Sequence, residues 1–596
     1  MKGFDVIKAK SAVKARNKMD LSAPVLASMD IGQIVPLGTW EMIPGDDFDI
    51  KLNAFSRLAP LVEPTYGKVT FKTLKAFVPY HQIAWDSEAW LAGKTSWEGQ
   101  TPHQRYMTVD ELRAFVQTYC VTSTNATAAN CDYSYIDANG ANQYRLFTTV
   151  GKYYIKVLNA LGYAVPQGVD LRTGSNWYST VAPKKLSAYP LLAFFKLYND
   201  YMSQSQRFNT SRLSDILQCV KYAKAVSGFT PTSGYVSGTL VKNLFDDLLL
   251  NYENDYFTSA WQNPNAALAG VDNITQVTVP GNTAQQGDYL VHNLNDTLLH
   301  LQANSGLFVT PGQRAIDMLR RFDDWVRRNN YSGSRSVQQL YSRFGIKTED
   351  YKSHYAHVIG VDEIPIQIGD VTATAAFQGN SSSGNIEIPL GDYAGKGIMS
   401  GNIRCQYKSS DFGMLFVIGY YTVTPLNAYG FDRSVLRSDP FDYYNPEFDG
   451  LGADAIPLME IFENPRGVAD GDTSSSISVY GFTERYNSYR YGRPKILGDF
   501  RKYQNSDPMN SWHTGRLLGD IRKAGNLVAQ ASAVQTLPQI NSEYNRIFSI
   551  TSGDVDHFYL TCWFDVSAVR PMLNLNQVPN LGEGDTVVSR NGNVIS

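Results

Sequence analysis

Few side chains of this chain are spaced as catalysis or metal binding would require. The eight histidines form no zinc-like pair on one helical face, and His354 and His357 have no third ligand close by in the sequence. Asp46, Asp47 and Asp49 could contribute oxygen ligands to calcium, but the preceding Pro-Gly makes an ordinary turn the simpler interpretation. We therefore predict no metal site.

Motifs for covalent catalysis and for nucleotide binding are also missing from the sequence. It contains neither a Gly-x-Ser-x-Gly elbow nor a Gly-x-x-x-x-Gly-Lys-Ser/Thr phosphate loop. Glu460 and Glu463 could serve a glycosidase, but such pairs are common by chance among 56 acidic residues. The sequence predicts no catalytic residue and no cofactor. A carbohydrate-active β-rich enzyme or a lectin stays open as an alternative.

Basic side chains gather at the N-terminus, although the whole chain has a formal charge of only -3. Residues 1–20 have a net charge of +4, which leaves -7 on the rest. Such an arm can bind phosphates without sequence preference, so single-stranded DNA is a candidate partner. A solvated tail, or a contact with an acidic neighbouring subunit, would explain the same pattern. The candidate nucleic-acid-binding residues are Lys2, Lys8, Lys10, Lys14, Arg16 and Lys18.

Tyrosine and arginine alternate in a block near residue 485, in a chain with 37 tyrosines and only 18% charged residues. Large amphipathic rings beside guanidinium groups are typical of protein interfaces. They can also stack on single-stranded bases, so a soluble DNA-binding protein is a further alternative. We favour a subunit interface. Its candidate residues are Tyr480, Arg485, Tyr486, Tyr489, Arg490, Tyr491 and Trp512.

The elements that must position these residues are mainly β-strands. Alternation predicts a half-buried strand over 68–78 and a strand over 557–566 whose apolar residues share one face, and residues 414–424 read as a mostly buried strand. Helices are expected at 189–201, 240–250 and 313–328, and ordered surface loops at 121–145, 263–306 and 371–402. Strands at both ends of the chain with helices between them argue against a parallel α/β sheet.

Several short runs occur in the order found in one virus family. Together they make the chain resemble the major capsid protein of the Microviridae, small icosahedral single-stranded-DNA phages, and their gokushovirus-like branch in particular. The runs are Met42–Asp46, Ala54–Pro60, Phe77–Tyr80, Tyr198–Tyr201, Asp255–Ala260, Tyr341–Gly345, Gly413–Tyr420, Phe441–Tyr444, Tyr480–Tyr491, Trp512–His513, Asp556–Phe558 and Arg570–Met572.

The resemblance implies an eight-stranded antiparallel viral jelly roll with long loop and helix insertions. Residues 30–110 and 395–570 would form its core, 111–394 the insertions, 1–29 a basic arm and 571–596 a C-terminal tail. The family assembles about 60 copies into a T=1 icosahedral shell around a circular single-stranded DNA genome. Implied partners are scaffolding proteins, small basic packaging proteins and a host receptor that meets the insertion loops. The resemblance also implies assembly in the bacterial cytoplasm, with the protein ending in the virion and not inserted in a membrane.

Overall fold

A computed structural model describes most of the chain from residue 16 onward. The longer stretches outside the description are 1–15, 172–184, 204–210, 261–353 apart from 321, 462–478, 501–508, 517–541 and 573–593 apart from 587–588. The expected helix at 313–328 and the expected loop at 263–306 therefore lie outside the described residues, apart from residue 321.

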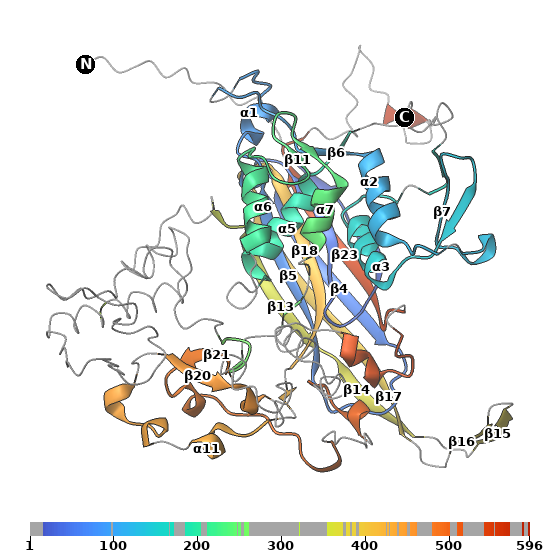
Figure 1. The fold of residues 1–596 in the computed structure, drawn as a ribbon. Coiled ribbons are helices and arrows are strands. Elements are labelled where there is room, and N and C mark those ends of the chain that lie inside the picture. The colour runs from blue at the N-terminus through green and yellow to red at the C-terminus, as the bar shows by residue number, and fades with distance from the viewer. Residues whose placement is uncertain are drawn as a thin grey trace.

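Two antiparallel sheets form the centre of the molecule (Figure 1). The first sheet has the order β2–β23–β4–β17–β14, with the short strand β1 also paired to β23, and the second has the order β13–β5–β18–β3. Their strands are β1 (Asn17–Asp20), β2 (Ala23–Met29), β3 (Ile34–Met42), β4 (Asp47–Leu58), β5 (Val69–Pro79), β13 (His357–Pro365), β14 (Gln367–Thr372), β17 (Tyr393–Lys408), β18 (Gly413–Val423) and β23 (Phe558–Arg570). The fold is thus mainly β and antiparallel, as the sequence predicts.

Strand β23 confirms the face predicted from alternation. Phe558, Leu560, Cys562, Phe564 and Val566 are all buried, and the side chains between them are more exposed. The buried face packs against the second sheet, because the ring of Phe558 stacks on Tyr421 of β18 at 4.1 Å between centroids. The predicted strand at 414–424 is likewise confirmed as the buried strand β18.

Strand β5 corrects one sequence prediction. Alternation predicted a half-buried strand, but every residue from Val69 to Pro79 is buried. One face of the second sheet packs on the first sheet, and α5 (Tyr189–Tyr201) packs against β5 and β18 on the other face. The lysines of β5 pair with acids of β13, which compensates their burial: Lys72 with Glu363 at 2.5 Å, and Lys75 with Asp362.

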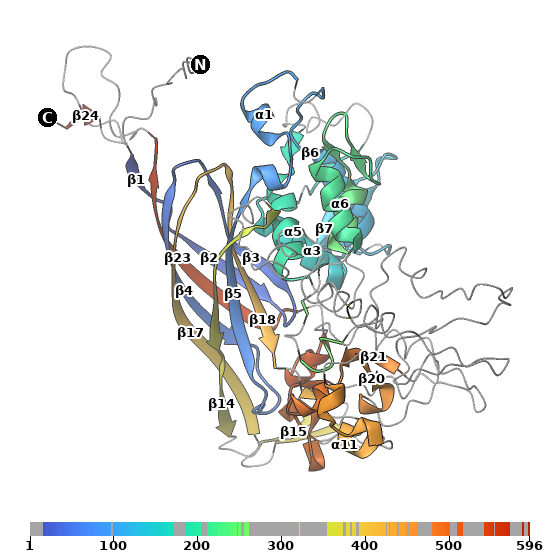
Figure 2. The same ribbon diagram turned by 90° about the vertical axis from the view of Figure 1, so that its left-hand side faces the viewer.

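Among the described residues, the helices lie over the second sheet (Figure 2). The predicted helix at 189–201 is confirmed, whereas the one expected at 240–250 runs from Gly238 to Phe245. The helices described are α1 (Ser87–Leu91), α2 (Val109–Phe115), α3 (Thr149–Ala160), α5, α6 (Ser211–Lys221), α7 (Gly238–Phe245) and α11 (Arg433–Leu436). None of the helices within the described ranges is long and apolar enough to cross a membrane.

The remaining strands form small sheets at the periphery. The hairpin β7–β8 lies within the predicted loop 121–145, and β15–β16 lies within 371–402. Residues 393–402 are not a loop, because they belong to β17: 393–398 pair with β14 and 398–402 pair with β4. The peripheral strands are β6 (Tyr106–Thr108), β7 (Tyr133–Ile136), β8 (Asn142–Arg145), β9 (Val169–Asp170), β10 (Lys185–Ser187), β11 (Phe229–Thr230), β12 (Tyr235–Val236), β15 (Phe377–Ser381), β16 (Gly384–Ile388), β19 (Leu426–Asn427), β20 (Ala453–Pro457), β21 (Val479–Glu484), β22 (Gly515–Arg516), β24 (Val587–Val588) and β25 (Val594–Ile595).

The five cysteines carry free thiols. Cys120 and Cys562 are buried, and burial raises the pKa of each of these two thiols to about 12. They are therefore protonated and unreactive at neutral pH, as structural thiols in a core are.

Candidate subunit-contact surface

A partly buried ion-pair network positions the tyrosine-rich part of the chain. Arg433 of α11 reaches Asp454 of β20 at 2.8 Å and Glu460 at 2.9 Å. Burial raises the pKa of both carboxyl groups, against the opposing effect of the Arg433 charge. Glu460, considered above as half of a carboxylate pair, is thus bound to an arginine inside the fold. The network fixes α11 to the β20–β21 hairpin.

Three of the seven predicted interface residues are buried within the chain itself. The Tyr480 hydroxyl donates to the carbonyl of Phe257 at 3.1 Å. The Arg485 guanidinium and the Tyr486 hydroxyl both donate to the carbonyl of Phe441, at 3.2 and 3.3 Å. These side chains hold the 441–448 segment against β21. They therefore position the exposed residues of the candidate contact surface and are not themselves available for contact.

The other predicted residues remain accessible. Tyr489, Arg490 and Tyr491 are exposed, and Trp512 is half-buried and stacks on Tyr66 with 5.6 Å between ring centroids. Arg490 bonds Asp449 at 2.7 Å and Glu484 at 3.2 Å. Its guanidinium is therefore held in place on the surface.

Sequence reasoning missed four further members of this surface. Arg437 lies over the ring of Tyr489 at 4.0 Å and near Tyr443 at 5.8 Å, and Tyr444 packs edge-on against Tyr489. Val435 of α11 is also exposed. The run Phe441–Tyr444 could have indicated Tyr443 and Tyr444, but it was used only for the family resemblance and not as a candidate site. We call this set of six exposed side chains and the half-buried Arg437 the tyrosine patch: Val435, Arg437, Tyr443, Tyr444, Tyr489, Arg490 and Tyr491.

The patch combines flat rings with oriented cations. Tyr443 and Tyr491 are 54% and 52% exposed. Rings of this kind bury a large area at a low cost in side-chain entropy, and arginine over a ring adds a cation–π attraction. The arrangement suits contact with another protein, and in principle it suits stacking on bases.

The uncovered face of the first sheet is a second exposed aromatic surface. Trp563 and Tyr559 of β23 point away from the core, and Phe55 of β4 and Leu26 of β2 both face Thr561 across the strands. Figure 2 shows that none of the described helices lies over this side. The sequence signal that was missed is the set of β23 residues between the buried ones. A sheet face in contact with water would have polar residues at these positions, but this strand has Tyr559 and Trp563.

The N-terminal arm is described only from Arg16. Lys18 is exposed on β1, which pairs with β23 so that Lys18 lies opposite Val569. Lys2, Lys8, Lys10 and Lys14 lie outside the described residues. The described end of the arm is therefore attached to the edge of the first sheet.

Two of the three carboxylates in the acidic turn considered for calcium contact basic side chains. Asp46 contacts Arg570 at 3.4 Å, and Asp49 makes a two-pronged contact with Arg404. Hydrogen bonds from Arg404 hold the pKa of the Asp49 carboxyl below its ordinary value. The Asp46 and Asp49 carboxylates are thus each paired with a guanidinium group.

Comparison with known proteins defines the class of this β-sheet protein with exposed aromatic surfaces as a viral capsid protein. Residues 8–107 and 175–581 match the family model described as Capsid protein (F protein). The chain belongs to this family, and it is a major capsid protein of the Microviridae, a structural protein and not an enzyme.

Two relatives support the assignment. The chain is 24% identical to Capsid protein VP1 of Chlamydia phage 1, over 94% of this chain and 95% of that protein. It is also 24% identical to Capsid protein VP1 of Bdellovibrio phage phiMH2K, over 40% of this chain and 41% of that protein. The resemblance seen in the sequence is therefore confirmed.

Proposed function

We propose that this capsid protein folds around an eight-stranded jelly roll and assembles into a T=1-like icosahedral shell. The strand pairing supports the jelly roll. If β2, β3, β4, β5, β13, β17, β18 and β23 are numbered one to eight, the first pairs with the eighth, the second with the seventh, the third with the sixth and the fourth with the fifth. A jelly roll has this pairing, because its four antiparallel strand pairs form one long ribbon that folds over into two sheets.

The domain boundaries follow from the same proposal. Residues 30–110 and 395–570 supply six of these eight strands, and we extend the core to β2 and to β13, which pair with β23 and β5. The rest of 111–394 forms insertions, and 1–22 and 571–596 are an arm and a tail.

The observation that carries the assembly proposal is the family match over most of the chain. About 60 copies would surround a circular single-stranded DNA genome, because weak contacts repeated by symmetry give a stable closed surface. Scaffolding proteins and a small basic packaging protein would take part during assembly in the host cytoplasm. Insertion loops would meet the host receptor.

Assembly of the native protein tests this proposal. Material from infected cells should sediment and scatter light as particles of many subunits, and electron microscopy should show round shells. A stable monomer of 66.4 kDa as the sole product in such cells would contradict it.

The tyrosine patch is our proposed subunit interface, and a charge change tests it separately. Tyr443→Asp together with Tyr491→Asp places charges at the centre of the contact, and their burial without partners should reduce shell yield at least tenfold. Tyr222→Asp, at an exposed tyrosine of the helical insertion, is the matched control. If the double variant forms normal shells, the tyrosine patch is not a subunit interface, and the assembly proposal is unaffected.

The basic arm is our proposed genome contact. Replacing Lys8, Lys10, Lys14 and Arg16 by glutamine should weaken DNA retention, because each lost phosphate contact removes a released counterion. The slope of log affinity against log salt should become shallower by roughly 3 for these four charges. Salt-dependent release of DNA from purified particles measures it.

A control variant that loses the same number of positive charges elsewhere distinguishes loss of the arm's DNA contacts from a change in the net charge of the subunit. Lys68, Lys224, Lys396 and Lys408 are exposed and lie outside the arm. Their replacement by glutamine should leave the salt dependence closer to wild type. Unchanged DNA retention by the arm variant at every salt concentration would make the arm a tie between subunits or a solvated tail.

A further inference from the structure

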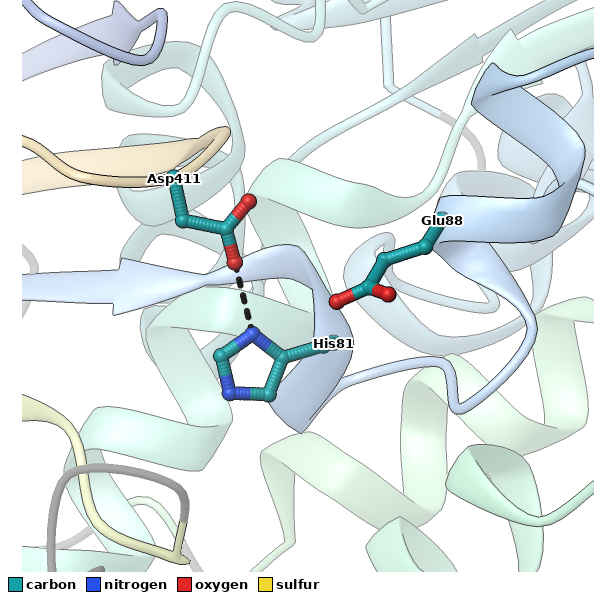
Figure 3. Close-up of side chains that lie close together, drawn as sticks. All are labelled: His81, Glu88 and Asp411. Atoms are coloured by element: carbon teal, nitrogen blue, oxygen red, sulfur yellow. Dashed lines mark hydrogen bonds and ion pairs between the residues drawn. The ribbon is translucent and has the colours of Figure 1, made fainter. Parts of the chain in front are cut away.

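Three potential metal ligands converge where the helical insertion leaves the second sheet. Figure 3 shows His81 from the 3₁₀ turn after β5, Glu88 from α1 and Asp411 from the turn between β17 and β18. One ligand atom from each residue lies within 4.8 Å of the others, and His81 Nδ1 is 2.7 Å from Asp411 Oδ2. Within the described part of the chain no other group of three such side chains comes together in this way.

The position of Asp411 is set by its own turn. Its Oδ1 accepts a hydrogen bond from the Phe412 amide at 2.7 Å, which leaves Oδ2 directed at His81. The Tyr80 amide donates to the carbonyl of Phe412 at 3.0 Å, so the turn and the His81 segment are joined by backbone. Two of the three ligands are thus oriented before any ion binds.

Glu88 completes the set from a third element. It lies on the first turn of α1, and its side chain is exposed and able to move toward the other two. The helix itself is held, because Asp86 at its N-terminus bonds the buried Arg105. His81 and Asp411 are only partly buried, at 29% and 31% exposure, so an ion can enter from solvent.

The donor set identifies the class of ion. One imidazole nitrogen with two carboxylates suits zinc or a similar divalent transition metal, whereas calcium and magnesium prefer oxygen ligands alone. Metal–ligand bonds of about 2.0–2.2 Å require donor atoms roughly 3 to 3.5 Å apart, which small side-chain rotations can provide here.

We propose that His81, Glu88 and Asp411 bind one divalent transition-metal ion, with zinc the best fit. The ion ties α1 to the β17–β18 turn, two segments more than 300 residues apart in the chain. It thereby joins the base of the helical insertion to the sheet, and water fills the open coordination position. Because the folded chain alone presents all three ligands together, binding stabilises the native state.

Zinc binding by the full-length protein tests the proposal. After treatment with a chelator and dialysis, competition with a chromogenic zinc indicator measures affinity, and thermal unfolding with and without zinc measures stabilisation. Glu88→Gln keeps the His81–Asp411 contact but removes a ligand, so zinc affinity should fall at least about tenfold. The double change His81→Gln with Glu88→Gln should abolish both the binding and the rise in Tm.

Glu447→Gln is the matched control, because it removes an exposed carboxylate far from any described ligand group. It should bind zinc as the wild type does. Equal zinc affinity in the wild type and in the Glu88→Gln and double variants would overturn the proposal. Stronger binding of calcium than of zinc by the wild type would overturn it as well.

Discussion

Replacing Phe564 by alanine should lower the free energy of unfolding by about 3–5 kcal/mol. Phe564 is 1% exposed on β23, the strand between β2 and β4, and its ring packs edge-on against Trp40 of β3 at 5.3 Å. The change removes contacts between the two sheets and leaves a cavity, since β-strands paired on both sides cannot close around it. Denaturant unfolding of soluble subunits, and their yield, measure the loss.

The adjacent residue provides a control on the same strand. Trp563 is larger than Phe564 but 49% exposed, and it points away from the core. Trp563→Ala should therefore destabilise the subunit far less than Phe564→Ala. An equal or larger loss for Trp563→Ala, or wild-type stability for Phe564→Ala, would contradict the assignment of the buried face.

Arg105→Met should cost about 3–5 kcal/mol, the range for breaking a buried ion pair from one side. The Arg105 side chain is fully buried, with contacts to Asp86 at 2.8 and 3.3 Å and to the carbonyls of His103 and Val220. Its removal leaves the Asp86 carboxylate buried with fewer partners. Thermal and denaturant unfolding of the full chain should report the loss as a lower Tm and a lower midpoint.

Two comparisons isolate the role of charge burial. Arg113→Met breaks a pair whose partner Asp110 is largely exposed, and it should cost no more than about 1 kcal/mol. Adding Asp86→Asn to Arg105→Met should recover part of the loss, because the uncompensated charge is gone. If the double variant loses the sum of both single effects, the two groups do not act as a pair.

Local sequence patterns were sufficient to predict elements whose burial follows directly from their own apolar residues. The alternation of Phe558 to Val566 predicted β23, because that strand buries one face. The continuous apolar run that starts at Tyr189 predicted α5, which is buried on nearly all sides from Tyr189 to Tyr198. Strand β5 was misjudged since its lysines read as solvent-facing. Their partners, Asp362 and Glu363, come from β13, nearly 300 residues later.

The candidate contact surface was visible in the sequence only as a local excess of tyrosine and arginine. The sequence located the tyrosine–arginine block but could not separate Tyr480 and Tyr486, which are buried, from Tyr489 and Tyr491, which are exposed. The difference depends on the 441–448 segment, whose carbonyl at Phe441 accepts from Tyr486. A tyrosine hydroxyl that donates to a backbone carbonyl holds its ring inside the fold. The local sequence around each tyrosine does not indicate which carbonyl will lie nearby.

By itself the sequence determined the family, the β-rich class and the opposite charges of arm and body, because these depend on residue type and order alone. The tertiary structure decided which strands pair, which face of the first sheet stays open, and which ligands meet. His81 and Asp411 are 330 positions apart and approach to 2.7 Å only when the β17–β18 turn lies against the end of β5. Metal-ligand spacing in the sequence therefore gave no sign of this cluster, since its geometry comes from strand pairing.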